Sequence, residues 1–219
     1  MVAIDGANRR GGSFFVNSST IGNYEDMVVD EIIPLIDSQF RTIAQAQGRL
    51  LAGFSMGGFA AWNLALANAD SFAGAWACCP GAFDATGLQD AMPLWNYGFK
   101  AAYGAAFGPD LPKPAKGPLF DGSSQDQETI RLWESGFGNV IGKLTNYQKR
   151  GAKLTEVRFD YGTNDGYDWI PHGTLATAAA LGAAGIKTSV AGHPAGHQIT
   201  TAMLEAGFFP LAQRLFGGN

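Results

Sequence analysis

Apolar and polar positions alternate along the chain in blocks that predict strands followed by helices. Short apolar runs predict buried strands at Val2–Ile4, Leu50–Leu51, Phe72–Cys79, Leu154–Asp160 and Thr188–Ala191. Between them, longer segments predict helices after Asn23, over Phe59–Asn68, over Leu175–Ala184 and over Ile199–Phe216. This alternation predicts an α/β fold with a mostly parallel sheet and helices on both of its faces.

The first helix is predicted from its start signal and its spacing. Asn23 is a suitable N-cap residue, and Val28, Ile32 and Ile36 recur every four residues, as on one helix face. Pro34 falls inside this pattern and is expected to bend the helix rather than abolish it.

The segment from about 80 to 139 interrupts the alternation of strands and helices. It combines prolines and glycines with many aromatic residues, among them Trp95, Tyr103 and Trp133. An insertion of this kind lies beyond the strand ends of a sheet, where it could cap a site or pack its aromatic side chains onto the body. We therefore expect one α/β-hydrolase-like domain over residues 1–219, with a cap-like insertion at about 80–139.

Composition narrows the class of protein. The chain has 219 residues, of which 46% are hydrophobic and 16% charged, as in a compact globular domain. Its net charge of −4 argues against a nucleic acid partner. No apolar run approaches the ~20 residues that span a bilayer, so no membrane association is expected. The N-terminal apolar run is too short for a signal peptide, and the compartment stays open.

Cys78 and Cys79 are the only cysteines and are adjacent. Neighbours on a strand point to opposite faces, so a disulfide between them would be strained. We interpret both as small hydrophobic residues in or beside the core, and no further metal ligands are visible close to them in the sequence.

The clearest chemical signal is the G-x-S-x-G pattern Gly53-Phe54-Ser55-Met56-Gly57. An apolar strand precedes it and a helix follows, which is the context of a nucleophilic serine on a sharp strand-to-helix turn. Side chains at the two glycine positions are expected to collide there. At the helix N-terminus, the N–H of Met56 is expected to stabilise an oxyanion.

A serine nucleophile needs a histidine base that a carboxylate orients, in the chain order Ser, Asp or Glu, His. Asp165 is predicted as the acid because it lies on the loop after a strand, with Asp160 and Asp168 as rivals. His172 opens a helix and is interpreted as structural. His193 and His197 both follow the last predicted strand, and His197 is favoured because it has more loop with which to reach Ser55.

Several segments together resemble one esterase family of the α/β-hydrolases. They are Tyr24–Asp37, the string GFSMGGFAAWNLAL from Gly53, the loop Ser13–Ser18, the G-x-x-D pattern at Gly162–Asp165 and Pro194–His197, which is similar to a P-G-G-H histidine motif. The family includes esterase D type S-formylglutathione hydrolases, feruloyl and acetylxylan esterases and mycolyltransferases. The resemblance implies the triad Ser55, Asp165 and His197 and independently favours His197 over His193.

The resemblance departs from the family pattern at the N-terminus. Family members usually have several strands before the position of Val2–Ile4, and the loop after those strands donates the second oxyanion N–H. We therefore expect a shortened α/β-hydrolase sheet with an exposed edge near Val2–Ile4. Since exposed edges pair between chains, a homo-oligomer that covers this edge is predicted.

The predicted activity is hydrolysis of carboxylic esters through an acyl-enzyme, without a metal or another cofactor. Phe14, Phe15, Asn17 and Trp95 are expected to line an apolar pocket for short-chain or aromatic acyl groups, such as acetyl or feruloyl. A thioesterase or an acyltransferase with the same triad is an alternative. A further alternative is a catalytically impaired binding or scaffold protein on the same fold.

Overall fold

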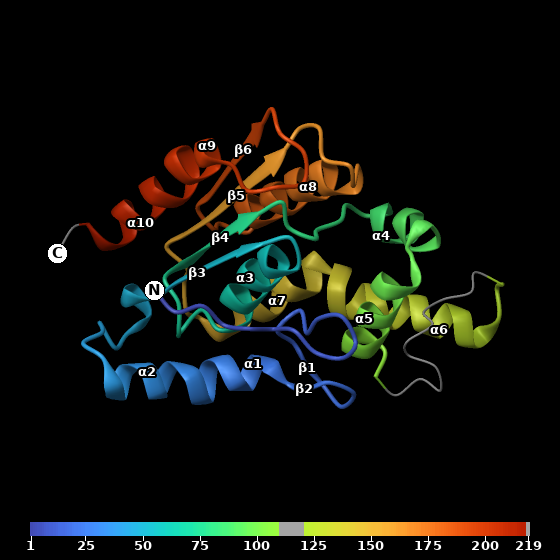
Figure 1. Cartoon of the computed structure of the whole chain (residues 1–219), viewed down its shortest axis with the longest axis horizontal. Helices are drawn as coiled ribbons and strands as arrows, with labels where there is room; N and C mark the ends of the chain where they lie inside the picture. The colour runs from blue at the N-terminus through green and yellow to red at the C-terminus, as the bar shows by residue number, and fades with distance from the viewer. Residues whose placement is uncertain (110–120, 218–219) are drawn as a thin grey trace.

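A computed structural model describes residues 1–109 and 121–217 of the chain. Four parallel strands, ordered β3-β4-β5-β6, form the central sheet (Figure 1). They span Leu50–Phe54, Gly74–Cys78, Glu156–Gly162 and Thr188–His193. A two-stranded antiparallel ribbon pairs β1, Asn17–Ser18, with β2, Gly22–Asn23. The predicted α/β class is confirmed, as are the strands that begin near Leu50, Phe72, Leu154 and Thr188.

Helices cover both faces of the sheet. One face carries α3, α7 and α8, which span Met56–Ala67, Val140–Arg150 and Trp169–Ala183. The C-terminal helical segment lies on the other face and comprises α9, η6 and α10 at Thr201–Met203, Leu204–Phe208 and Phe209–Phe216. There Trp76 of β4 packs against Phe208, with ring centroids 5.4 Å apart. A short 3-10 turn, η2, spans Ala46–Gly48.

The predicted strand at Val2–Ile4 is wrong. Residues 1–16 have no regular structure, and β3 pairs only with β4 within the described sheet. A strand forms only where a neighbouring chain satisfies its N–H and C=O groups, and the N-terminal segment has no such ladder with β3. Within the described residues β3 and β6 are the two edges of the sheet, so the edge expected at Val2–Ile4 is formed by β3 instead.

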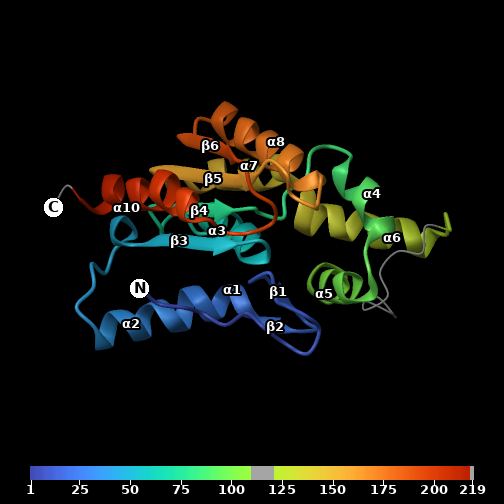
Figure 2. The same cartoon turned by 45° about the horizontal axis from the view of Figure 1, so that its top comes forward.

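The first helical segment forms as predicted and lies beyond the β3 edge (Figure 2). It comprises α1, Tyr24–Asp26, the π-helical η1, Met27–Ile32, and α2, Ile33–Gln39. The π-helical turn ends just before Pro34, which lacks a backbone donor, and the helix continues through this proline as expected. Asn23 occupies the N-cap position as predicted, but its side chain makes no capping bond. The side chain of Asn17 accepts the N–H groups of Glu25 and Asp26 instead.

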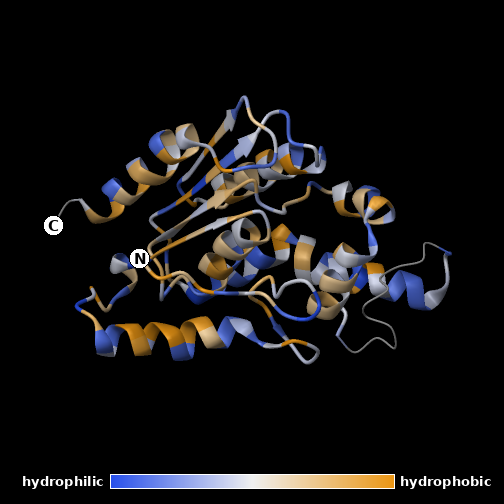
Figure 3. Ribbon diagram, viewed as in Figure 1, coloured by the Kyte–Doolittle hydropathy of each residue, from blue (hydrophilic) through white to orange (hydrophobic). Residues whose placement is uncertain are grey.

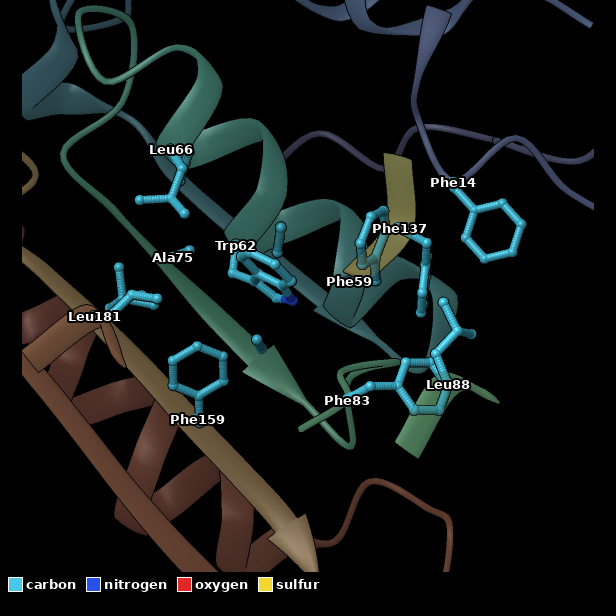
Figure 4. Close-up of a cluster of buried hydrophobic side chains, with 14 of the residues drawn as sticks. Phe14, Phe59, Trp62, Leu66, Ala75, Phe83, Leu88, Phe137, Phe159 and Leu181 are labelled. Carbon is cyan, nitrogen blue, oxygen red and sulfur yellow. The ribbon is translucent and has the colours of Figure 1, made fainter. Parts of the chain in front are cut away.

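The described part of the 80–139 segment is mostly helical, and residues 110–120 lie outside the described residues. Its helices are α4, η3, α5, α6 and η5, at Gly87–Ala91, Met92–Leu94, Tyr97–Phe107, Ser124–Trp133 and Glu134–Gly138. Their aromatic side chains pack against the body, and Phe137 stacks on Phe59 of α3 with centroids 4.2 Å apart (Figure 4). The cap-like role expected for this segment remains a prediction. No helix in the described residues is long and apolar enough to cross a membrane.

Candidate active site

Ser55 occupies the sharp turn between β3 and α3. Its backbone angles, φ 54° and ψ −115°, lie in a region that non-glycine residues rarely adopt. The Ser55 N–H donates to the Cys78 carbonyl at 2.9 Å, and the Ser55 carbonyl accepts from the N–H groups of Phe59 at 3.0 Å and Gly81 at 3.3 Å. Bonds from two neighbouring elements thus hold the strained conformation in place.

The glycines of this turn are not equivalent. A Cβ atom on Gly53 would lie 2.0 Å from the Gly57 carbonyl oxygen, and one on Gly58 would lie 2.8 Å from the Cys78 carbonyl oxygen. A Cβ on Gly57 would meet nothing within 4 Å outside its own helix. The expectation that both glycines of G-x-S-x-G avoid a collision is correct for Gly53 and wrong for Gly57. Close backbone packing requires Gly58 instead.

The carboxyl ends of β3, β5 and β6 bring Ser55, Asp165 and His197 together. His197 Nε2 lies 2.9 Å from Ser55 Oγ, and His197 Nδ1 lies 2.8 Å from Asp165 Oδ2. The side chain of Asp165 is fully buried, whereas 20% of the His197 side chain is exposed. This is the geometry in which a carboxylate orients an imidazole toward a serine hydroxyl.

The loops that carry the acid and the base are joined through their backbones. Thr163 N–H donates to the His193 carbonyl at 2.8 Å and Asn164 N–H to the Ala195 carbonyl at 3.0 Å. Within the acid loop, Asp165 Oδ1 accepts the N–H of Tyr167 at 2.9 Å. A Cβ on Gly162 would lie 2.2 Å from the carbonyl oxygen of Gly196, so glycine permits this close approach. The two loops are therefore positioned as one unit.

Asp160 and His193, the rivals for the acid and the base, form a separate pair. His193 Nε2 lies 2.7 Å from Asp160 Oδ1, and the Arg158 guanidinium bonds both oxygens of the same carboxylate. Trp76 Nε1 donates to Asp160 Oδ2 at 2.8 Å. Asp160 is fully buried, and its acceptor capacity is occupied by these donors. His172 lies on the exposed surface of α8, apart from both pairs.

Two aromatic rings flank His197. The Phe54 ring centroid lies 4.8 Å from that of the imidazole, and the Tyr167 ring meets it edge-on at 4.9 Å. Burial alone would lower the pKa of His197, but hydrogen bonds with Cys79 and Asp165 outweigh it and raise the pKa above its usual value. At low pH the imidazole therefore holds its proton more tightly than a free histidine does.

Cys79 is a site residue that the sequence interpretation missed. It follows β4, is fully buried, and its Sγ lies near His197 and Asp165. A hydrogen bond with Cys78, together with that of His197, lowers the pKa of the Cys79 thiol to about 5, while the pKa of Cys78 is raised. The only signal in the sequence was its place at a strand end, because its contacts come from loops more than 80 residues away.

The N-terminus of α3 points its free backbone donors toward the serine turn. Met56 is the first residue of this helix, so its N–H has no acceptor within the helix. Its side chain lies against Gly12, where a Cβ would be 2.3 Å from the Met56 Sδ. The position of Met56 agrees with the expected oxyanion donor, and that role stays a proposal.

Two of the four residues expected to line the substrate pocket are buried in the core. Phe14 is 1% exposed and Trp95 6% exposed, so both belong to the core. Phe14 packs against Phe59 and Phe137 (Figure 4). Phe15 packs edge-on against Tyr24.

Asn17, the fourth of these residues, caps the first helix. It also lines a hollow of about 710 Å³ that Glu25 and Lys143 border and that no triad residue lines.

The parallel sheet, the strained serine at a strand-to-helix turn and the histidine and aspartate on later strand ends together define an α/β-hydrolase fold. The family described as "Putative esterase" matches residues 15–132, which is more than half of the chain. The chain belongs to this family of esterases.

Comparison with known proteins extends this result. An esterase of Mycobacterium tuberculosis, present in two strains, is 43% identical over 60 residues, which are 26% of this chain and 13% of the esterase. A solved ferulic acid esterase superposes with a TM-score of 0.60 at 17% identity, covering 93% of this chain and 64% of that one. An S-formylglutathione hydrolase from Agrobacterium tumefaciens gives a TM-score of 0.57 at 18% identity, covering 93% and 64%. The chain thus spans less than two thirds of these proteins, and the structural likenesses establish the fold.

Proposed function

We propose that the chain is a serine esterase that hydrolyses carboxylic esters through an acyl-enzyme. The observation that carries the proposal is the continuous hydrogen-bonded chain from Ser55 Oγ through His197 to Asp165, with bonds of 2.9 and 2.8 Å. Membership of the esterase family supports the same class of reaction.

Each group of the triad has one task in the proposed reaction. Ser55 Oγ attacks the ester carbonyl while His197 Nε2 takes the hydroxyl proton. Asp165 keeps the other proton of the imidazole on Nδ1 and stabilises the imidazolium that forms. His197 then protonates the leaving alcohol and activates the water that releases the acid.

The oxyanion of each tetrahedral intermediate would bind the N–H of Met56 at the positive end of the α3 dipole. Removing one such donor from an esterase or protease typically costs ~2.7–4 kcal/mol of transition-state stabilisation. If Met56 is the sole donor in the assembled protein, turnover would be slow rather than absent.

We propose short-chain or aromatic acyl groups, such as acetyl or feruloyl, as the acid part of the substrate. The rings of Phe54 and Tyr167 around His197 support an apolar surround for the acyl group, in place of the buried Phe14 and Trp95. The similarity to a ferulic acid esterase supports testing aromatic esters first, and thioesters follow from the similarity to an S-formylglutathione hydrolase.

We further propose that a homo-oligomer covers the free edge of β3. Ala52 on this strand is exposed, whereas every residue of β4 is buried. Large apolar side chains that precede β3 in the chain are also exposed, at 50% for Val2, 52% for Leu35 and 62% for Phe40. Figure 3 shows the run of apolar residues along α2. Such an edge with apolar flanks favours pairing between chains.

The proposal is tested by hydrolysis of p-nitrophenyl acetate and butyrate by the chain beside its Ser55→Ala variant. Turnover that disappears in the variant supports the esterase. A fluorophosphonate probe gives a second measurement, because only an activated serine is labelled rapidly. If neither turnover nor labelling depends on Ser55, the scaffold alternative replaces the esterase. Added alcohol acceptors then separate hydrolysis from acyl transfer by the products formed.

A further inference from the structure

The thiol of Cys79 lies in a cluster with two triad side chains. One ligand atom each from Cys79, Asp165 and His197 lies within 4.8 Å of the others. These residues follow the carboxyl ends of three adjacent strands, β4, β5 and β6. The cluster therefore forms where the sheet brings three loops together.

The backbone around Cys79 holds the thiol in this position. Its φ of 42° places it in the left-handed region, and its N–H donates to the Asp160 carbonyl at 2.7 Å. Its Sγ also lies 3.8 Å from the Gln198 carbonyl, on the loop that carries His197. The neighbouring Cys78 has another environment, since its Sγ contacts Met203 Sδ at 3.6 Å.

A thiolate, an imidazole and a carboxylate are the side-chain ligands that bind Zn²⁺ in proteins. Ordinary bond lengths of about 2.3 Å to sulfur and 2.0–2.2 Å to nitrogen and oxygen place neighbouring tetrahedral ligands about 3.3–3.7 Å apart. The Cys79, Asp165 and His197 ligand atoms lie within 4.8 Å of one another, and His197 Nδ1 lies 2.8 Å from Asp165 Oδ2, so side-chain movements of about 1 Å reach this spacing. Three protein ligands leave the fourth position for water.

We propose that Cys79 Sγ, an Asp165 carboxylate oxygen and His197 Nδ1 form a binding site for Zn²⁺, and that the bound ion switches off Ser55. Binding of the ion needs only the geometry of the three ligands. The switching effect rests on the proposed esterase function, because it acts on the proposed base.

The inhibition follows from where the imidazole proton lies. In the working triad His197 carries a proton on Nδ1 and uses the Nε2 lone pair to accept the proton of Ser55. A metal ion bound at Nδ1 takes the other lone pair, so the single ring proton moves to Nε2. There it points at Ser55 Oγ as a donor, and the ring can no longer act as the base. Any proton that Cys79 still carries as a thiol leaves on ligation, because the thiolate is the form that binds the ion.

The test uses direct binding of Zn²⁺ and Co²⁺ to the purified full chain. Calorimetry measures Zn²⁺ affinity, and a near-ultraviolet thiolate-to-cobalt charge-transfer band reports ligation by sulfur. Ser55→Ala keeps all three ligands and should bind like the wild type. Cys79→Ser should weaken Zn²⁺ binding at least tenfold, since even second-shell changes cost metal sites about 10–100-fold.

Matched variants separate this site from other thiols and histidines. Cys78→Ala removes the neighbouring thiol, and His172→Ala removes a histidine exposed on α8. Both should retain the affinity and the cobalt band. Asp165→Asn should weaken binding like Cys79→Ser, which keeps the test decisive if one variant fails to fold.

Each possible result either supports or overturns the proposed zinc site. A cobalt–thiolate band that persists in Cys78→Ala and disappears in Cys79→Ser supports the site. A wild-type protein without that band, or a Zn²⁺ affinity unchanged by Cys79→Ser and Asp165→Asn, overturns it. Ester hydrolysis measured with a chelator present tests the esterase separately. Zinc binding by a protein without Ser55-dependent turnover would uphold the site and reject the proposed enzyme.

Discussion

His197 Nε2 lies 2.9 Å from Ser55 Oγ, although 142 residues separate the two in the chain. The contact joins the loop after β6 to the turn after β3, at opposite edges of the sheet. Most of the chemistry proposed for this protein depends on that single contact and on the protonation state of its imidazole.

The pH dependence of turnover should reflect the raised pKa of His197. The base must be neutral to accept the Ser55 proton, so kcat/KM should fall as the pH decreases through the pKa of His197 in the folded protein. Because that pKa is raised, the inflection should lie above the ordinary value of about 6.5. A kcat/KM profile with p-nitrophenyl acetate measures it, with the exposed His172→Ala variant as control. An inflection below about 6.5 would contradict the environment described for His197.

Asp165→Asn should lose catalytic activity, whereas Asp160→Asn should lose stability. Asp165→Asn should fold and lose about 10³–10⁴-fold in kcat, because the imidazole loses the group that orients it. Asp160→Asn leaves the Arg158 guanidinium without its buried carboxylate and should lower the free energy of unfolding by about 3–5 kcal/mol. Chemical denaturation and ester hydrolysis, measured on both variants, separate the effects. The same loss of activity at full stability in both would assign Asp160 to the chemistry.

Gly53→Ala and Gly57→Ala form a matched pair within the serine turn. The new Cβ at Gly53 would overlap backbone that cannot move, so we expect a loss of about 3 kcal/mol or more in the free energy of unfolding. The new Cβ at Gly57 meets open space on a helix, where alanine is favoured over glycine by about 1 kcal/mol. Thermal unfolding of the two variants measures the contrast. Equal destabilisation would mean that the turn differs from the one described.

Lys143 should make the stability of the protein depend on pH in the alkaline range. It lies half-buried on α7 facing α3, where Nζ donates to the Gly136 carbonyl and lies 5.6 Å from the Phe59 ring centroid. Burial lowers its pKa to about 8, against the opposing effect of Glu25.

The lowered pKa of Lys143 determines how stability changes with pH. Between about pH 8 and 10.5 the unfolded chain keeps the Lys143 proton and the folded chain has lost it, so stability should rise with pH. Relative to Lys143→Met, we expect the wild type to gain about 1–3 kcal/mol across this range. Denaturation series over pH measure it, with the exposed Lys149→Met as control. A constant difference between wild type and Lys143→Met would refute the prediction.

Light scattering tests the proposed oligomer. We expect a dimer or a larger assembly at assay concentrations, and we expect Ala52→Pro on β3 to shift it toward monomer, because proline removes an edge donor. Leu94→Glu, at an exposed position far along the chain, is the control. A monomeric wild type would reject the assembly while leaving the esterase proposal unaffected.

The sequence predicted most of the elements because their patterns are local. Strand and helix periodicity located β3, α3, β5 and α8, and the glycine pattern around Ser55 located the turn. Which strands pair with each other is not determined by local sequence. Val2–Ile4 has the composition of a strand, but a strand also needs a neighbour, which composition does not reveal.

The same limit applies to the candidate site. Chain order and motif resemblance singled out Asp165 and His197, which lie within hydrogen-bond distance as predicted. Nothing in the sequence distinguished the buried Phe14 from a pocket residue, because an aromatic side chain suits both environments. Cys79 was interpreted as core, which its burial agrees with, but its nearness to His197 arises only from the meeting of three strand ends.

The order of the strands has a consequence for how the molecule reaches its native state. Gly74 of β4 pairs with Glu156 of β5, so 82 residues must be bridged before the second half of the sheet can form. Closing such long loops costs conformational entropy before native contacts form to offset it. Proteins rich in pairings between distant residues therefore fold slowly. Ser55 and its turn can form early, whereas Asp165 and His197 arrive only when β5 and β6 have docked. Recovery of nucleophilic reactivity at Ser55 therefore reports completion of the whole sheet.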